Sequence, residues 1–261
     1  MRIVTFASGS TGNCSLISDG KTNILIDAGI SMRRVVAALA EYGLTPQDLC
    51  GVLITHEHSD HISGLNMLNK YYRLPIIAPP ELCEVLQSSK PELSRSLNAA
   101  SVGEVLNIDS LGIRPFRTPH DSAFSVGYRF EGSEGFAFAT DTGMITDEML
   151  DGLTGVDTAL IEANHDVEML RSGSYPYFLK KRILADRGHL SNSECGKLAV
   201  SLANSGTKRI ILGHLSRENN TPALALSTVK TALEGFDTEV YVATMSDFLE
   251  VRVGEEEKCS V

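Results

Sequence analysis

The chain has 261 residues, 43% of them hydrophobic, and carries a formal net charge of −10 at pH 7. This apolar content supports a packed core and excludes a disordered chain. The acidic surface repels phosphate backbones at long range, which argues against a protein that coats nucleic acid non-specifically. It does not exclude a nuclease, because bound cations and a local basic patch can reverse the field inside one cleft.

The length suits one domain over residues 1–261. The N-terminal residues MRIVTFASGSTGNCS turn polar after a short apolar run, unlike a signal peptide, and no apolar stretch approaches the roughly 18 residues that cross a bilayer. The cysteines are odd in number, scattered and without a C-x-x-C pair, at Cys14, Cys50, Cys83, Cys195 and Cys259. We therefore expect a cytoplasmic protein without disulfides or a membrane partner.

The N-terminal half begins with strand-like runs at 2–7, 14–18 and 23–27, which Gly-rich and Asp-Gly turns separate. Apolar residues at helical spacing predict a helix over 31–42, with Ser31 as N-cap. A short buried strand is predicted at 51–55. Ser59 or Asp60 is expected to cap one following helix, which carries Ile62, Leu65, Leu68 and Tyr72 on one face.

The remaining elements alternate between strands and helices. Four strands are predicted within 103–141, and others at 157–163 and 209–214. Helices are predicted at 191–204 and 222–234, the first with a capping box between Ser191 and Glu194. The runs at 239–244 and 247–253 are expected to close the chain as a hairpin. This order indicates an α/β sandwich with sheets inside and helices outside.

The densest polar motif is THEHSDHISG at 55–64, between a predicted strand and a predicted helix. His56 and His58 are two residues apart in an extended turn and can reach one metal, whereas Asp60 and His61 can serve a second. Imidazole and carboxylate ligands suit zinc, manganese, iron or nickel. Two metals about 3.5–4 Å apart can generate hydroxide at neutral pH and stabilise a phosphoryl or carbonyl group. The alternative is a histidine-rich helix cap without metal.

This turn supplies only half of a two-metal site. Other candidates lie at further predicted strand ends, namely His120, Asp141, His189 and His214. Active sites in layered α/β folds assemble on loops over strand ends, so we expect these side chains to join the turn. A hydrogen-bonded interior histidine stays the alternative for His120 and His214, and a helix cap near residue 146 for Asp141.

These motifs resemble those of the metallo-β-lactamase superfamily over nearly the whole chain. LIDAG with Asp27 resembles its first motif, HEHSDH its second, His120 its third, ATDTG with Asp141 its fourth and GH with His214 its fifth. The resemblance implies a four-layered αββα sandwich that binds two divalent ions, with zinc or manganese favoured. The first ion would take His56, His58 and His120, the second Asp60, His61 and His214, and Asp141 would bridge both.

Further details resemble one branch of the superfamily. SGSTGN at 8–13, IEANHD at 161–166, and DRGHLSN followed by LGHLSRENN are similar to the YycJ-like (WalJ) proteins, whose members are regarded as DNA exonucleases or phosphodiesterases. The spacing from His120 to Arg129, and His189 ahead of a helix, resemble ribonuclease Z. The glyoxalase II pattern H-T-x-G-H-T is absent around His120, which argues against a thioesterase.

Several residues have roles that the sequence leaves open. Asp27 is expected to accept hydrogen bonds from the metal-bearing turn, or to be an ordinary turn residue. His189, and Asp60 among the ligands, are the candidate catalytic residues. The resemblance to ribonuclease Z implies that His189 protonates the leaving oxygen or stabilises phosphoryl charge; the alternative is a helix-capping or structural histidine. The following helix is expected to lower the pKa of His189, and a nearby phosphate to raise it again. His165 is assigned to substrate or to structure. Lys181 and Arg182, in the densest basic stretch, would contact a nucleic-acid backbone or form a solvated helix face.

The sequence therefore favours a two-metal hydrolase in which a bridging hydroxide attacks phosphorus, with DNA trimmed from an end as the favoured substrate. A small phosphodiester is the second possible substrate, supported by the acidic charge. A regulatory metal-binding protein without activity is the third hypothesis, and the complete ligand set argues against it.

Overall fold

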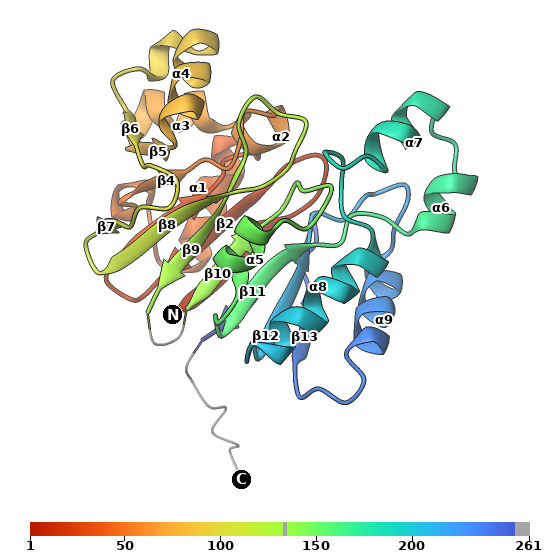
Figure 1. Cartoon of the computed structure of the whole chain (residues 1–261). Coiled ribbons are helices and arrows are strands. Elements are labelled where there is room, and N and C mark those ends of the chain that lie inside the picture. The colour runs from red at the N-terminus through yellow and green to blue at the C-terminus, as the bar shows by residue number, and fades with distance from the viewer. Residues whose placement is uncertain (133–134, 254–261) are drawn as a thin grey trace.

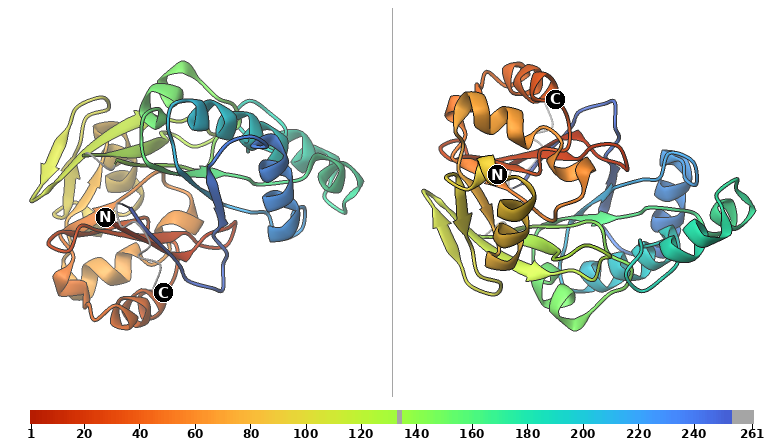
Figure 2. Two further views of the ribbon diagram at one scale, coloured as in Figure 1. Left: turned by 90° about the horizontal axis from the view of Figure 1, so that it is seen from below. Right: turned by 90° about the horizontal axis from the view of Figure 1, so that it is seen from above.

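The computed structural model describes residues 1–132 and 135–253. Within these residues, two seven-stranded sheets pack against each other and helices cover both outer faces (Figures 1 and 2). This arrangement confirms the predicted αββα sandwich. The two central layers are β-sheets because their strands are apolar on both faces, whereas each helix has one apolar face to bury.

The first sheet has the strand order β14-β1-β2-β3-β4-β5-β6. Its strands are β1 (Arg2–Ala7), β2 (Cys14–Ser18), β3 (Asn23–Ile26), β4 (Gly51–Leu53), β5 (Ile76–Ala78), β6 (Leu97–Ala99) and β14 (Leu249–Arg252). The strands β3 to β6 are parallel, with Leu25 opposite Val52. The strands β14, β1, β2 and β3 are antiparallel.

The second sheet has the order β13-β12-β11-β10-β9-β8-β7. Its strands are β7 (Leu106–Ile108), β8 (Leu111–Arg117), β9 (Val126–Glu131), β10 (Phe136–Ala139), β11 (Thr158–Glu162), β12 (Arg209–Gly213) and β13 (Glu239–Val242). The strands β10 to β13 are parallel. Both sheets are thus half antiparallel and half parallel, and the parallel strands end at the same edge of the sandwich.

The helices complete the outer layers. They are α1 (Met32–Glu41), α2 (Ser59–Ile62), α3 (Leu65–Tyr72), α4 (Pro80–Ser89), α5 (Asp147–Leu153), α6 (Val167–Ser172), α7 (Tyr177–Ile183), α8 (Asn192–Asn204) and α9 (Pro222–Ala232), with short 3-10 helices at Pro46–Asp48 and Pro91–Leu93. Helices α6 and α7 extend away from the sandwich (Figures 1 and 2). None of the helices in the described part of the chain is long and apolar enough to cross a membrane.

Strand alternation divides the buried side chains into three apolar layers. In β1, Ile3 faces the other sheet, whereas Val4 and Phe6 face α1. In β11, Leu160 faces the first sheet and Ile161 faces α8. The core between the sheets contains the aromatic rings of the second sheet, which compensate for the absence of tryptophan.

Three local predictions are wrong. The last two strands form no hairpin: β13 pairs with β12 and β14 pairs with β1, so the chain crosses from one sheet to the other to complete both edges. The helix after residue 59 breaks into α2 and α3, because Gly64 donates its N–H to Ala28 O and follows the neighbouring loop. Its N-cap position is His58, not Ser59 or Asp60.

Other local predictions are confirmed. Ser31 caps α1 and Ser191 caps α8, each accepting a backbone N–H three residues on. The capping box is only half formed, since the Glu194 carboxylate pairs with Lys197. The four cysteines within the described residues are free, and Cys259 lies outside those residues.

Candidate metal centre

The residues predicted as metal ligands meet at the edge where the parallel strands end. His56 follows β4, Asp141 follows β10 and His214 follows β12, and Asp27, predicted to hydrogen-bond the turn that bears them, follows β3. His120 lies on the loop after β8. The two sheets therefore bring together residues that are up to 158 positions apart in the sequence, between His56 and His214.

Among the described residues, ligand-type atoms form four overlapping groups, each with all its atoms within 4.8 Å of one another. Two of them contain Asp141: His56, His61 and Asp141, and Asp141, Glu162, His189 and His214. The remaining two are the predicted sets, the first with His56, His58 and His120 and the second with Asp60, His61 and His214. In the first, His120 Nε2 lies 3.3 Å from His58 Nδ1. In the second, Asp60 Oδ2 lies 3.5 Å from Nε2 of both His61 and His214.

Asp141 lies between the two groups. Its Oδ1 is 3.5 Å from His214 Nε2 and 3.8 Å from His120 Nε2, and its Oδ2 is 3.3 Å from His61 Nε2. Among the described residues, Asp141 Oδ2, His56 Nε2 and His214 Nε2 are buried with no hydrogen-bond partner. Unpaired buried polar atoms are costly, so their convergence fits divalent cations, which accept imidazole and carboxylate ligands.

The outer nitrogens of the histidine rings are held by other groups. Nδ1 lies 2.7 Å from Asp27 Oδ2 in His61, and 2.8 Å from Glu162 Oε1 in His214. His56 Nδ1 contacts Thr55 Oγ1 at 3.1 Å, and His120 Nδ1 contacts Gly188 O at 3.2 Å. Each acceptor favours the tautomer that carries hydrogen on Nδ1 and leaves the Nε2 lone pair free for a cation.

Asp27 occupies the position expected of it. Besides contacting His61, its carboxylate accepts the N–H of Thr55 at 2.9 Å and the Thr55 hydroxyl. Burial raises the pKa of Asp27, although His61 opposes this shift. The carboxylate thus connects the end of β3 to the turn that bears the histidines.

Glu162, at the end of β11, is a site residue that the sequence did not single out. It is fully buried, and its Oε1 lies 2.7 Å from His189 Nδ1 and 2.8 Å from His214 Nδ1. Its Oε2 accepts the N–H groups of Thr142 and Leu190. Burial favours the neutral acid, but His189 and then His214 outweigh it and hold the pKa of Glu162 low. In the sequence, the only indication of this role was the acidic residue within the motif IEANHD at 161–166.

His189 lies beside the ligand groups, and its ring centroid is 5.3 Å from that of His214. The expected lowering of its pKa is wrong. Burial does favour the neutral ring, but the Glu162 carboxylate outweighs burial, and the pKa of His189 is raised. The helix cannot supply the expected effect because α8 begins at Asn192, beyond the Ser191 cap.

The candidate ligands shift one another's pKa values. Burial lowers the pKa of His56, and the neighbouring histidines add to this effect. Burial has the same effect on His61, but Asp141 and Asp27 outweigh it and raise the pKa of His61 to about 10. The carboxyl of Asp60 has a lowered pKa, against burial, because the rings of His214 and His61 lie beside it. A cation at this group competes with protons for the imidazoles.

Backbone strain and close packing position these side chains. Asp27, Asp141 and His214 all have φ near +60°, at 60°, 56° and 56°, a region that non-glycine residues rarely adopt. Gly29 allows the turn of Asp60 to approach closely, since a Cβ at Gly29 would overlap the Asp60 carbonyl. Strain held in this way is characteristic of functional sites.

The predicted substrate residues belong to none of the ligand groups. Arg182 pairs with Asp121, and Lys181 is exposed on α7. His165 is 1% exposed, and burial lowers its pKa to about 4. Both ring nitrogens of His165 are buried without a hydrogen-bond partner, so its role, substrate or structure, stays a prediction. Within the same basic stretch, Arg187 donates to the carbonyls of His120 and Ser122, and so holds the His120 loop.

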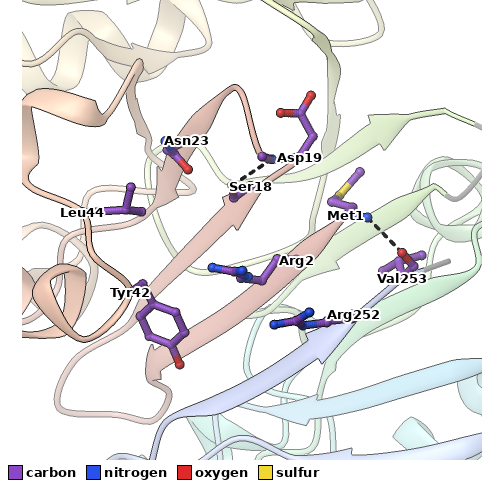
Figure 3. A pocket seen from close by; sticks show the side chains of 10 residues that line it. Met1, Arg2, Ser18, Asp19, Asn23, Tyr42, Leu44, Arg252 and Val253 are labelled. Atoms are coloured by element: carbon purple, nitrogen blue, oxygen red, sulfur yellow. Dashed lines mark hydrogen bonds between the residues drawn. The ribbon is translucent and has the colours of Figure 1, made fainter. Parts of the chain in front are cut away.

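A cavity of about 170 Å³ adjoins the centre. Ser10, Asn164, Arg182 and His189 are among its lining residues. A larger cavity of about 540 Å³ lies elsewhere, on the β1, β2 and β14 side, with Arg2, Tyr42 and Arg252 around it (Figure 3). That second cavity is lined by none of the predicted site residues.

Comparison with known proteins identifies the family. A model described as the beta-lactamase superfamily domain matches residues 22–215. The chain belongs to the metallo-β-lactamase superfamily. It is 40% identical over 240 residues to exodeoxyribonuclease WalJ of Streptococcus pneumoniae, covering 90% of this chain and 89% of that protein. Exodeoxyribonuclease YycJ of Bacillus anthracis is 36% identical over 230 residues, which are 87% of each chain.

Solved structures of this superfamily share the fold. The human tRNase Z short form superposes with a TM-score of 0.64 and is 16% identical, with 98% of this chain and 100% of that chain covered. At this identity the likeness establishes the fold alone. The resemblance to the YycJ-like branch and, in fold, to ribonuclease Z is confirmed.

Proposed function

We propose that this superfamily member is a metal-dependent phosphodiesterase that degrades DNA from an end. The observation that carries the proposal is a cluster of ligand-type side chains beside the His189–Glu162 pair. The cluster consists of His56, His58, Asp60, His61, His120, Asp141 and His214. The names of the two exodeoxyribonuclease relatives support DNA as substrate. We also propose that the protein is cytoplasmic.

We assign the ligands as two sets bridged by Asp141: His56, His58 and His120 for one ion, and Asp60, His61 and His214 for the other. Zinc and manganese are the favoured ions, since the set contains imidazole and carboxylate and no thiolate. Two such ions, when bound, would lower the pKa of water and neutralise phosphoryl charge. Asp27 and Glu162 would keep the rings of His61 and His214 oriented.

His189 is positioned to donate a proton to the leaving oxygen. Its Nδ1 faces Glu162, so its Nε2 is the atom left to face a substrate in the adjoining cavity. The Glu162 carboxylate favours the protonated ring, which is the form that a general acid needs. Arg182 lines the same cavity, where it can contact a phosphate after exchanging its Asp121 partner.

The decisive experiment compares metal-reconstituted protein on end-labelled single- and double-stranded DNA, on RNA and on bis(p-nitrophenyl) phosphate. We expect progressive loss of nucleotides from a DNA end. His189→Ala should lower DNA turnover about 10²–10⁴-fold while metal content stays full. The loss should be smaller for nitrophenolate, a leaving group that needs little protonation. Loss of metal in this variant would make His189 a ligand and contradict the assignment.

A small phosphodiester remains the second candidate substrate. The cavity beside His189 is only about 170 Å³ in volume, and the chain is acidic overall. Efficient turnover of small diesters together with no turnover of any DNA or RNA end would favour this candidate over the nuclease.

A further inference from the structure

Two aromatic side chains stand exposed on the part of the molecule that projects from the sandwich. We call residues 167–187, which contain α6 and α7, the arm (Figures 1 and 2). On α7, Tyr177 is 82% exposed and Phe178 is 73% exposed, more than any other large apolar side chain of the described residues. Large aromatic side chains left exposed at successive positions are typical of binding surfaces.

The arm is basic although the chain is acidic. Residues 167–187 contain five basic and two acidic side chains, in a chain of net charge −10. A groove of about 510 Å³ on the arm is lined by Tyr177 together with Arg171, Lys180 and Lys181. Lys180 donates to the carbonyls of Arg171 and Gly173 and so joins α6 to α7. An aromatic ring beside cations is complementary to the bases and phosphates of a nucleic-acid strand.

The other side of α7 faces the candidate metal centre. Leu179, Arg182 and Ile183 line the cavity that contains His189. A single short helix therefore separates the aromatic groove from the cavity where hydrolysis is proposed. A strand that lies along the groove can continue over α7 to His189.

We propose that the arm is a stacking platform for single-stranded nucleic acid, on which bases stack against Tyr177 and Phe178. Lys181 contacts a phosphate of the same strand, and the strand end enters the cavity at His189. This inference rests on the proposed nuclease function and specifies how its substrate is held. A second copy of the chain is disfavoured as the occupant, because a symmetric contact would place two basic arms against each other.

The absence of tryptophan provides a direct test. Tyr177→Trp introduces the only tryptophan of the chain, on the arm, and a base that stacks on it should quench the tryptophan emission. The matched control is Tyr71→Trp, which lies on α3, is 60% exposed and also has a lysine over its ring. A phosphorothioate oligothymidylate should quench the arm fluorophore saturably, whereas blunt duplex DNA and the control should show little change.

Aromatic substitutions provide the second test. Tyr177→Ala with Phe178→Ala should weaken oligothymidylate binding at least about 5-fold, since each stacked base contributes that much or more. The ratio of kcat/KM for the oligonucleotide to that for bis(p-nitrophenyl) phosphate should fall equally. Exchanging the rings, Tyr177→Phe with Phe178→Tyr, should retain both values.

The outcomes separate the two proposals. DNA turnover with no quenching and an unchanged KM in the alanine pair would overturn the platform but not the nuclease. Quenching without turnover of any nucleic acid would contradict the nuclease and support the arm as a binding surface. A wild-type dimer that the alanine pair converts to monomer in sedimentation would identify a self-association face and overturn the platform.

Discussion

At the residue scale, Glu162 is the side chain on which most of the site geometry depends. Its four hydrogen bonds join two histidines to two backbone N–H groups. In Glu162→Gln, the amide oxygen can accept hydrogen bonds either from the two histidine rings or from the two backbone N–H groups. The amide NH₂ would then face whichever pair of donors remains, and could not accept from them. We expect metal affinity and turnover to fall about 10–100-fold. The exposed Glu168→Gln on α6 is the matched control, and equal metal affinity in both variants would contradict the role.

The ligands themselves show why residue-level patterns were informative. A cation needs several donors at once, so histidines and acids at strand ends are meaningful as a set. In contrast, the buried ring of His165 belongs to none of the ligand groups found among the described residues. Its position beside Asp166 in the sequence carried no comparable constraint.

At the scale of elements, Gly29 sets the distance between the loop after β3 and the metal-bearing turn. In Gly29→Ala the new methyl group would overlap the Asp60 carbonyl, and backbone atoms cannot rotate away. We expect about 3 kcal/mol of destabilisation, the upper part of the range for overpacking, with loss of metal. Gly112→Ala in β8, where the nearest neighbours are side chains, is the control. Denaturant unfolding of both variants measures the difference.

Within the described residues, Lys181 on α7 is the only cationic side chain of the basic stretch that makes no hydrogen bond or ion pair. Lys180, Arg182 and Arg187 each bind other groups of the protein. Of the two predicted contacts, Lys181 can therefore reach a phosphate without first releasing a partner, whereas Arg182 must exchange Asp121. Lys181→Ala should reduce the salt slope of single-strand binding by about 0.7. Lys230→Ala on α9 provides the control, and an identical slope in both variants would leave Lys181 as a solvated residue.

At the scale of the whole molecule, the candidate centre joins the two sheets. Ligands come from both halves, so bound metal should resist their separation. At a free-metal concentration about 100 times Kd, metal binding raises the free energy of unfolding by about 2.7 kcal/mol. We expect chelation to lower Tm by roughly 5–10 °C and to abolish turnover. His58→Ala with His214→Ala should respond much less, and elemental analysis should find about two ions in the parent protein. An unchanged Tm on chelation would contradict a site that spans the sheets.

The sequence by itself determined most strands, the sandwich class and the set of candidate ligands. Alternating apolar runs and caps act over a few residues, and THEHSDH places four ligands within one turn. The tertiary structure alone decided that β13 and β14 belong to different sheets, because strand pairing partners depend on which edges are open. It alone decided that Glu162 holds His189 and His214, because these contacts join the end of β11 to the loops after α7 and β12, which are distant in the sequence and meet only in the folded chain.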